Sequence, residues 1–361
     1  YYTPVQVVRY MTGALDRALR EHLDVDGFMD GRVNILDPAV GTGTFLLGVA
    51  ERVREQEGGA GGGMAAAALH DLARRMYGFE LLVGPYAVAH YRLHHTLRRG
   101  ENEDGDDVEM DPFPRLGVYL SDTLAETGAD APAGQLGFVS AGISEERQEA
   151  NRIKTEQPIL AIIGNPPYRR LRRGENETLV GRWMDQLWSD LKQPVADAGK
   201  AGELNTFPEM SVAFWRWAIW KLFEADNAPE RGVVAFITNR KFLTGWPYAG
   251  LRRMMRERFD RIEIIDLRGD VRAGVRGGVE SDVGVFDIQV GTAITLAVAD
   301  GSRAGEPADI HYLDSWADSR FTRREKLDWL DDGAADGRLA NAVAVERGLL
   351  DNMRPLPVQN G

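Results

Sequence analysis

The sequence contains no cysteine among its 361 residues. Disulfide frameworks, cysteine zinc sites, thiolate nucleophiles and iron–sulfur clusters are therefore excluded. Long apolar runs are also missing, because the runs at 159–164 and 233–237 are far shorter than the ~18 residues of a membrane span. No basic, apolar leader opens the chain. We therefore expect a cytoplasmic protein that does not enter a membrane.

The net charge of −12, from 43 basic and 55 acidic side chains, argues at first against a nucleic-acid partner. The charge is unevenly distributed, however. Residues 101–150 hold 13 acidic and 2 basic side chains, whereas residues 169–276 hold 20 basic and 15 acidic ones. One acidic segment thus accounts for nearly all of the excess, and the net charge does not exclude a DNA-binding face.

Apolar runs typical of β-strands alternate with helical patterns through most of the chain. The strands are expected at 33–37, 76–80, 118–122, 159–163, 232–239, 261–267 and 292–298. Several of these runs are continuous rather than alternating, which is typical of strands covered on both faces. The pattern predicts a doubly wound α/β sheet.

We expect three parts along the chain. These are an N-terminal helical segment (1–32), a main domain (33–300) and a C-terminal extension (301–361). Three segments rich in charged residues or glycine interrupt the alternation and are expected to be loop insertions in the main domain. They are residues 101–157, 169–204 and 268–284.

A glycine turn follows the first expected strand and leads into a helix. Glycine lets the backbone approach a ligand closely, and a helix N-terminus presents free amide groups to it. A dinucleotide-binding fingerprint would need a third glycine where Leu46 stands, and the Lys of a P-loop is missing. The candidate ligand-binding residues are Asp37, Pro38, Ala39, Gly41, Thr42, Gly43 and Phe45.

Acidic residues stand at the ends of the second and third strands. Glu80 is placed to accept hydrogen bonds from ribose hydroxyls, or else it caps the following helix. Asp122 either accepts from an adenine amine or caps the next turn. The sequence leaves both choices open.

The fourth strand ends in Asn165-Pro166-Pro167-Tyr168. Two prolines stop the strand and hold the preceding asparagine extended. The amide oxygen of Asn165 and the carbonyl of Pro166 could together accept both hydrogens of an amino group. The ring of Tyr168 could stack on a planar base or amide.

DPAVGTGTF, GFE and NPPY, in this order, resemble the S-adenosylmethionine-dependent DNA adenine-N6 methyltransferases of the γ arrangement. Over residues 1–300 the chain is most similar to the methyltransferase portion of Type ISP restriction–modification enzymes. The resemblance implies a Rossmann-like methyltransferase sheet, mostly parallel with an antiparallel last strand and helices on both faces. It also implies base flipping and an adenine-specific DNA methyltransferase of a restriction–modification or phage-defence system.

The resemblance implies S-adenosylmethionine as the cofactor, with a YTP segment as its lid. The pocket so implied comprises Tyr2, Thr3, Pro4, Asp37, Pro38, Ala39, Gly41, Thr42, Gly43, Phe45, Glu80, Asp122, Asn165 and Asn205. Tyr248 occupies the place of the aromatic residue that stacks on the flipped adenine opposite Tyr168, with Phe242 and Trp246 as alternatives. No metal is expected.

Double-stranded DNA is the expected partner. Arginines flank the tetrad and occupy a later glycine-rich segment, where phosphates beside a flipped base would pass, although an arginine cluster can also be a solvated face. They are Arg169, Arg170, Arg172, Arg173, Arg272 and Arg276. The chain contains no helicase or nuclease motif and no full target-recognition domain, so other residues or subunits would supply these components.

Several alternatives remain. Cytosine-C5 methylation requires a cysteine nucleophile and is excluded. Glutamine-N5 methylation of a protein also uses NPPY, but that family is compact and lacks the YTP segment. A catalytically silent cofactor- or DNA-binding subunit is a further alternative. His90 and His94 lie four residues apart, but Tyr91 stands where a zinc HExxH motif needs Glu.

Overall fold

The computed structural model describes residues 3–57, 63–101, 107–109, 113–125, 137–169, 179–206, 209–270, 282–317, 319–346 and 348–355. Within these residues a nine-stranded sheet runs in the order β11-β10-β8-β9-β7-β6-β1-β2-β5. Its strands are β1 (Ile35–Asp37), β2 (Met76–Glu80), β5 (Gly117–Leu120), β6 (Ala161–Gly164), β7 (Gly232–Asn239), β8 (Arg261–Arg268), β9 (Thr292–Ala299), β10 (Asp309–Asp314) and β11 (Val343–Ala344). A separate two-stranded sheet pairs β3 (Arg99–Glu101) with β4 (Asp107–Glu109).

The strand directions confirm the expected mostly parallel sheet. β9 lies between β7 and β8 and is antiparallel to both. The pairs β1–β2, β2–β5, β1–β6, β6–β7 and β8–β10 are parallel. The carboxyl ends of these parallel strands therefore meet at one edge of the sheet, which is where ligands bind in open α/β sheets.

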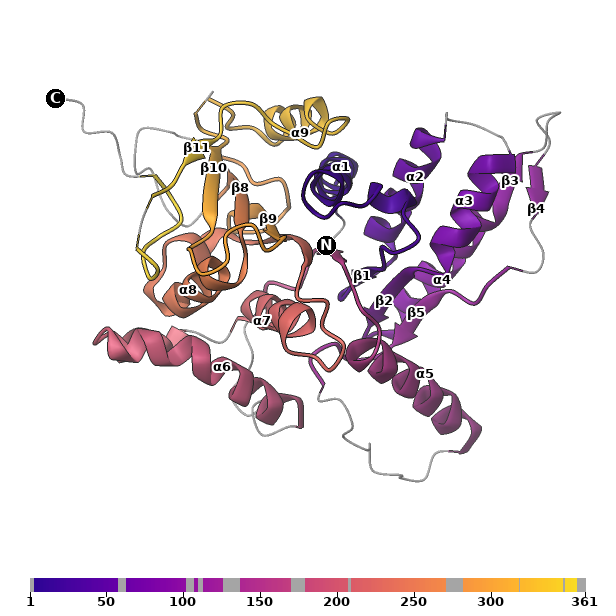
Figure 1. The fold of residues 1–361 in the computed structure, drawn as a ribbon, viewed down its shortest axis with the longest axis horizontal. Helices are drawn as coiled ribbons and strands as arrows, with labels where there is room; N and C mark the ends of the chain where they lie inside the picture. Colours follow the sequence, from indigo (N-terminus) through magenta and orange to yellow (C-terminus); the bar gives the residue numbers. More distant parts are fainter. Residues whose placement is uncertain are drawn as a thin grey trace.

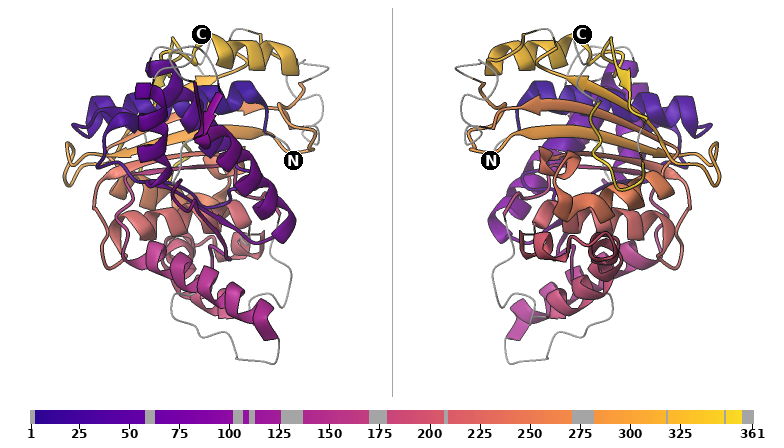
Figure 2. Two further views of the ribbon diagram at one scale, coloured as in Figure 1. Left: turned by 90° about the vertical axis from the view of Figure 1, so that its right-hand side faces the viewer. Right: turned by 90° about the vertical axis from the view of Figure 1, so that its left-hand side faces the viewer.

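Helices cover both faces of the sheet (Figures 1 and 2). One layer contains α1 (Val5–His22), α2 (Thr44–Gln56), α3 (Gly63–Ala73), α4 (Val83–Arg98) and α9 (Arg323–Asp332). The other contains α5 (Gly137–Thr155), α6 (Leu179–Asp197), α7 (Met210–Phe223) and α8 (Ala249–Arg258). Neighbouring strand residues enter opposite cores, as Ile35 and Leu36 do, so a buried strand needs apolar residues in sequence. Among the helices described, none combines the length and apolar character that would let it cross a membrane.

Short 3-10 helices connect the larger elements. They are η1 (Gly27–Met29), η3 (Ala201–Thr206), η4 (Arg240–Leu243) and η5 (Trp246–Tyr248). The last two lie between β7 and α8 and carry the aromatic residues that the sequence analysis singled out.

Two helices lie in segments where loops were expected. α5 buries Ala150 and Ile153 in the second core, and α6 buries Trp188 and Leu191 there. The expectation of loops is therefore wrong for residues 137–155 and 179–197. The second half of α5 is rich in charged residues, whereas α6 carries Leu187, Trp188, Leu191 and Val195 at helical spacing, a signal that the expectation of a loop overlooked. Tertiary packing stabilises both helices. Of the third segment, residues 271–281 lie outside the described residues.

The sheet continues beyond residue 300. β10 pairs in parallel with β8, and β11 pairs with β10. α9 packs beside α1 (Figure 1). Arg17 of α1 donates from Nε to the Gly337 carbonyl at 3.1 Å. The segment that was set apart as a C-terminal extension thus shares the sheet and one helical layer with the main domain.

Candidate active site at the carboxyl edge of the sheet

The glycine turn after β1 is held by residues from neighbouring strands. Gly41 and Gly43 have positive φ angles of 55° and 82°, a conformation that side chains with a Cβ rarely adopt. The Gly41 amide donates to Glu80 Oε2 at 3.0 Å, and the Leu82 amide donates to Glu80 Oε1 at 2.8 Å. Glu80 therefore braces the turn and also bonds the amide just before α4.

The rest of the turn is equally fixed. Arg92 of α4 donates from Nη1 to the carbonyl of Thr42 at 2.8 Å and to its Oγ1 at 3.1 Å. Thr123 Oγ1 donates to the Pro38 carbonyl. Phe45 is buried in the first core. The turn is thus a preformed backbone cradle at the N-terminus of α2.

Asp37 is the most unusual titratable group of this edge. It is 1% exposed, its Oδ1 accepts from the Ala39 amide at 2.9 Å, and its Oδ2 is buried with no hydrogen-bond partner among the described residues. Burial raises the pKa of Asp37 to about 8, and the nearby charge of Glu80 acts in the same direction. A buried acceptor of this kind fits a ligand donor group.

Asp122 caps a turn in this structure. Its Oδ1 accepts from the Leu124 amide at 3.0 Å, and its backbone carbonyl accepts from Lys154 Nζ at 2.7 Å. Lys154 is fully buried, and burial lowers its pKa to about 8. The turn-capping alternative for Asp122 is therefore realised, and the second alternative, an adenine amine, stays a prediction.

The tetrad directly follows β6, at the same edge as Asp37 and Glu80. Asn165 Nδ2 donates to Thr3 Oγ1 at 3.2 Å, and Asn165 Oδ1 accepts from the Tyr168 hydroxyl. Tyr168 also donates to the Ile237 carbonyl of β7 at 3.2 Å. Since an amide oxygen can accept two hydrogen bonds, Asn165 Oδ1 can still take a further donor. Pro166 is buried and Pro167 is exposed.

Thr3 brings the N-terminal segment into this site. It is 7% exposed and immediately precedes Pro4, the N-cap of α1. Its contact with Asn165 joins residues 162 positions apart. Burial and the charge of Glu209 raise the pKa of the Tyr168 hydroxyl, which is therefore neutral and a hydrogen-bond donor at physiological pH.

The candidate stacking residues differ in exposure. Tyr248 and Phe242 are 4% and 3% exposed, whereas Trp246 is 42% exposed. The Tyr248 hydroxyl donates to Glu209 Oε2 at 2.8 Å. Sequence reasoning missed Glu209; its only signal was an acidic residue directly before the aromatic helix α7.

The remaining predicted residues are only partly described. Arg169 is exposed, and its carbonyl accepts from the Met210 amide at 2.9 Å. Asn205 lies in η3, but its side chain is outside the described residues, as is all of Tyr2. The arginines whose positions are not described are Arg170, Arg172, Arg173, Arg272 and Arg276.

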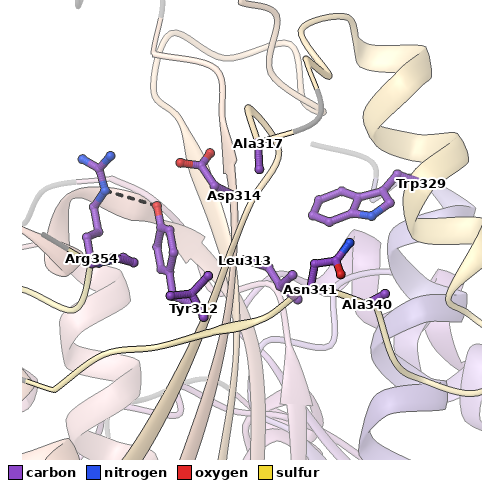
Figure 3. Close-up of a pocket in the computed structure, with 10 residues that line it drawn as sticks. Tyr312, Leu313, Asp314, Ala317, Trp329, Ala340, Asn341 and Arg354 are labelled. Atoms are coloured by element: carbon purple, nitrogen blue, oxygen red, sulfur yellow. Dashed lines mark hydrogen bonds between the residues drawn. The ribbon is translucent and has the colours of Figure 1, made fainter. Parts of the chain in front are cut away.

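A cavity of about 260 Å³ lies farther along the carboxyl edge, beside β10 and α9 (Figure 3). Trp329 of α9 lies on one side of it, and Tyr312 and Arg354 lie on the other. Arg354 Nε donates to the Tyr312 hydroxyl at 3.1 Å. Among the described residues, none of those predicted for the site lines this cavity. In the part of the chain that is described, no three His, Asp or Glu side chains come together as metal ligands.

Comparisons with solved structures identify the fold. The ATP-dependent Type ISP restriction–modification enzyme LlaBIII bound to DNA superposes with a TM-score of 0.76, 24% identity and 98% of this chain covered. A nuclease-deletion mutant of the Type ISP enzyme LlaGI with a DNA substrate mimic has a TM-score of 0.76 and 24% identity over 99% of this chain. The DrdV–DNA complex has a TM-score of 0.70 and 26% identity over 98% of this chain.

The chain spans 22%, 27% and 31% of the lengths of these three proteins. The similarity to Type ISP enzymes that the motifs indicated is therefore confirmed at the level of the fold. No protein-family model matches the chain. A comparison with curated protein sequences found no match either.

Proposed function

We propose that this chain is the methyltransferase part of a DNA-modifying enzyme and transfers a methyl group from S-adenosylmethionine to the N6 amine of a flipped adenine. The observation that carries the proposal is the orientation of Asn165. Its Nδ2 bonds Thr3, so its Oδ1 faces the Tyr168 hydroxyl beside β7. An oriented acceptor beside an aromatic ring suits an amino group on a planar base.

The residues present fit the cofactor. The amides of the Gly41–Gly43 turn and the N-terminus of α2 would hold its polar part, and Glu80 would accept from its ribose hydroxyls. A neighbouring cation favours the ionised form of a carboxyl group, so Asp37 would lose its proton beside the ammonium group of the cofactor and its unpartnered Oδ2 would accept from that group. When bound, the cofactor supplies an activated methyl group on a sulfonium.

The chain's own residues would then orient the acceptor amine. Asn165 Oδ1 and the Pro166 carbonyl would accept its two hydrogens and favour a pyramidal nitrogen with its lone pair free. Tyr168 would stack on the base, a contact worth ~1–3 kcal/mol. No base is needed before transfer, because the proton can leave afterwards. Orientation of this kind can supply ~7–11 kcal/mol of the barrier.

Double-stranded DNA is the proposed substrate. The three proteins compared above were solved with DNA or a DNA substrate mimic. Arg169 is exposed directly after the tetrad, where a phosphate beside a flipped base would pass. Target recognition, helicase and nuclease functions would come from other residues or subunits, in a cytoplasmic restriction–modification or phage-defence system.

The test is transfer of tritiated methyl groups to mixed plasmid DNA, with a protein substrate in parallel. The wild-type chain should label DNA at adenine N6. Asn165→Ala should reduce transfer more than a hundredfold and leave the Kd of S-adenosylmethionine within about twofold. Asn227→Ala is the matched control, since the side chain of Asn227 bonds the Glu156 carbonyl on the surface. Labelling of protein instead of DNA, or loss of cofactor binding in Asn165→Ala, would contradict the proposal.

A further inference from the structure

Glu209 is a buried carboxyl group that bonds Tyr248, the candidate stacking residue, and Asn239 at the end of β7. It lies directly before α7 and is 5% exposed. Each of its oxygens accepts one hydrogen bond from a neutral donor. Asn239 Nδ2 donates to Oε1 at 2.7 Å, and the Tyr248 hydroxyl donates to Oε2 at 2.8 Å. These two bonds tie Asn239 and Tyr248 to one side chain, and we call the Glu209 carboxyl group their anchor.

The anchor joins three segments that meet at the tetrad. Asn239 is the last residue of β7 and the N-cap of η4. Its Oδ1 accepts from the Lys241 amide at 3.1 Å. The same strand supplies the Ile237 carbonyl to Tyr168. The residue after Glu209 donates its amide to the carbonyl of Arg169, the residue after Tyr168.

We propose that Glu209 is a positioning residue that fixes the ring of Tyr248 and the end of β7 around the flipped base. This inference rests on the proposed function. A tyrosine hydroxyl lies on the axis of the second side-chain torsion, so a bond to it at 2.8 Å restricts the first torsion and fixes where the ring lies. The second torsion, which sets the plane of the ring, is restricted by the packing of Tyr248 in the second core. A preset ring can receive the base without a further ordering cost.

Two neighbouring aromatic residues lack this anchor. Trp246 is largely exposed, and the Lys200 ammonium lies 5.5 Å from its ring centroid. Phe242 packs in the second core as Tyr248 does, but its side chain has no polar atom that could bond Glu209. Of the three candidate stacking residues, Tyr248 is therefore the one whose side chain bonds Glu209.

The experiment compares Glu209→Ala, Glu209→Gln and Tyr248→Phe in the methyl-transfer assay, with cofactor affinity measured separately. Glu209→Ala should lower kcat/KM for DNA about tenfold to a hundredfold and leave the Kd of S-adenosylmethionine within about twofold. Glu209→Gln keeps one acceptor oxygen, and its amide can donate to the Tyr248 oxygen, so it should retain most of the activity. Tyr248→Phe keeps the ring and loses only the anchor.

A double-mutant cycle separates positioning from general stability. If Glu209 acts through the Tyr248 hydroxyl, the double variant Glu209→Ala with Tyr248→Phe should be no worse than Glu209→Ala alone. Glu263→Gln is the control. Glu263 is a half-buried carboxylate, 15% exposed, that pairs with Arg17 at 2.6 Å, and its strand β8 is separated from β6 by β9 and β7. Glu263→Gln should lower the free energy of unfolding but not kcat/KM of the folded protein.

Additive losses in the cycle, or an activity loss in Glu209→Ala no larger than in Glu263→Gln, would overturn the inference. If Glu209→Ala does not fold, full activity of Tyr248→Phe would overturn it, and a tenfold loss in that variant would support it. Absence of methyl transfer to DNA by the wild-type chain would instead refute the proposed function. The two failures are therefore distinguishable.

Discussion

Replacing Asp37 by Asn should stabilise the fold by an amount that grows with pH. Burial raises the pKa of Asp37 from an ordinary value of 3.8 to about 8. The folded chain therefore keeps a proton that the unfolded chain releases between about pH 4 and pH 8. The stability contributed by the neutral acid is present below pH 4 and is lost as pH rises toward 8.

The size of the effect follows from the two pKa values. Each pH unit inside this window lowers the wild-type free energy of unfolding by about 1.4 kcal/mol. At pH 7 the accumulated loss is on the order of 4 kcal/mol, and at pH 5 it is on the order of 1.5 kcal/mol. Asparagine is neutral at every pH and can still accept from the Ala39 amide as Asp37 does. The advantage of Asp37→Asn should therefore grow by on the order of 2.5 kcal/mol from pH 5 to pH 7.

Urea unfolding followed by far-UV circular dichroism at pH 5, 6, 7 and 8 measures the free energy of unfolding of the variant and of the wild type. The contributions of the other titrating groups largely cancel when one value is subtracted from the other. Asp30→Asn is the matched control. Hydrogen bonds from Arg32 lower the pKa of Asp30, so Asp30 is ionised in the folded and the unfolded chain across this pH range. The difference in unfolding free energy between Asp30→Asn and the wild type should therefore not change with pH. A constant or shrinking advantage of Asp37→Asn between pH 5 and pH 8 would refute the reasoning.

Two further substitutions test the geometry of the carboxyl edge by denaturant unfolding. Gly43→Ala should lower the free energy of unfolding by about 1–2 kcal/mol, because Gly43 has a φ of 82°. Gly31 has open space around it and no positive φ, so Gly31→Ala should leave the free energy of unfolding almost unchanged. Equal losses in the two variants would contradict this prediction. Arg240→Met should cost about 3–5 kcal/mol, because Arg240 holds the fully buried Asp266 through two bonds of 2.6 Å, and adding Asp266→Asn should recover part of the loss. A cost below 1 kcal/mol for Arg240→Met would show that the ion pair is dispensable.

The sequence by itself determined the fold class and the order of the motifs. Strands buried on both faces must be apolar at consecutive positions, so β1, β2, β6, β7, β8 and β9 could be read directly from their apolar runs. The carboxyl ends of the parallel strands among them share one edge, so the residues at the ends of β1, β2 and β6, namely Asp37, Glu80 and Asn165, were also predictable as neighbours. These features depend on local sequence and on one general rule of sheet topology.

Only the tertiary structure decided how these residues are held. The raised pKa of Asp37 arises from burial by distant segments, and the orientation of Asn165 depends on Thr3, 162 positions away. The anchoring of Tyr248 by Glu209 likewise joins residues 39 positions apart. The helices α5 and α6 and the strands β10 and β11 also escaped prediction, because the pairing or packing partners that stabilise them are remote in sequence. The helical spacing of apolar residues in α6 and their alternation in β10 were signals that the prediction overlooked.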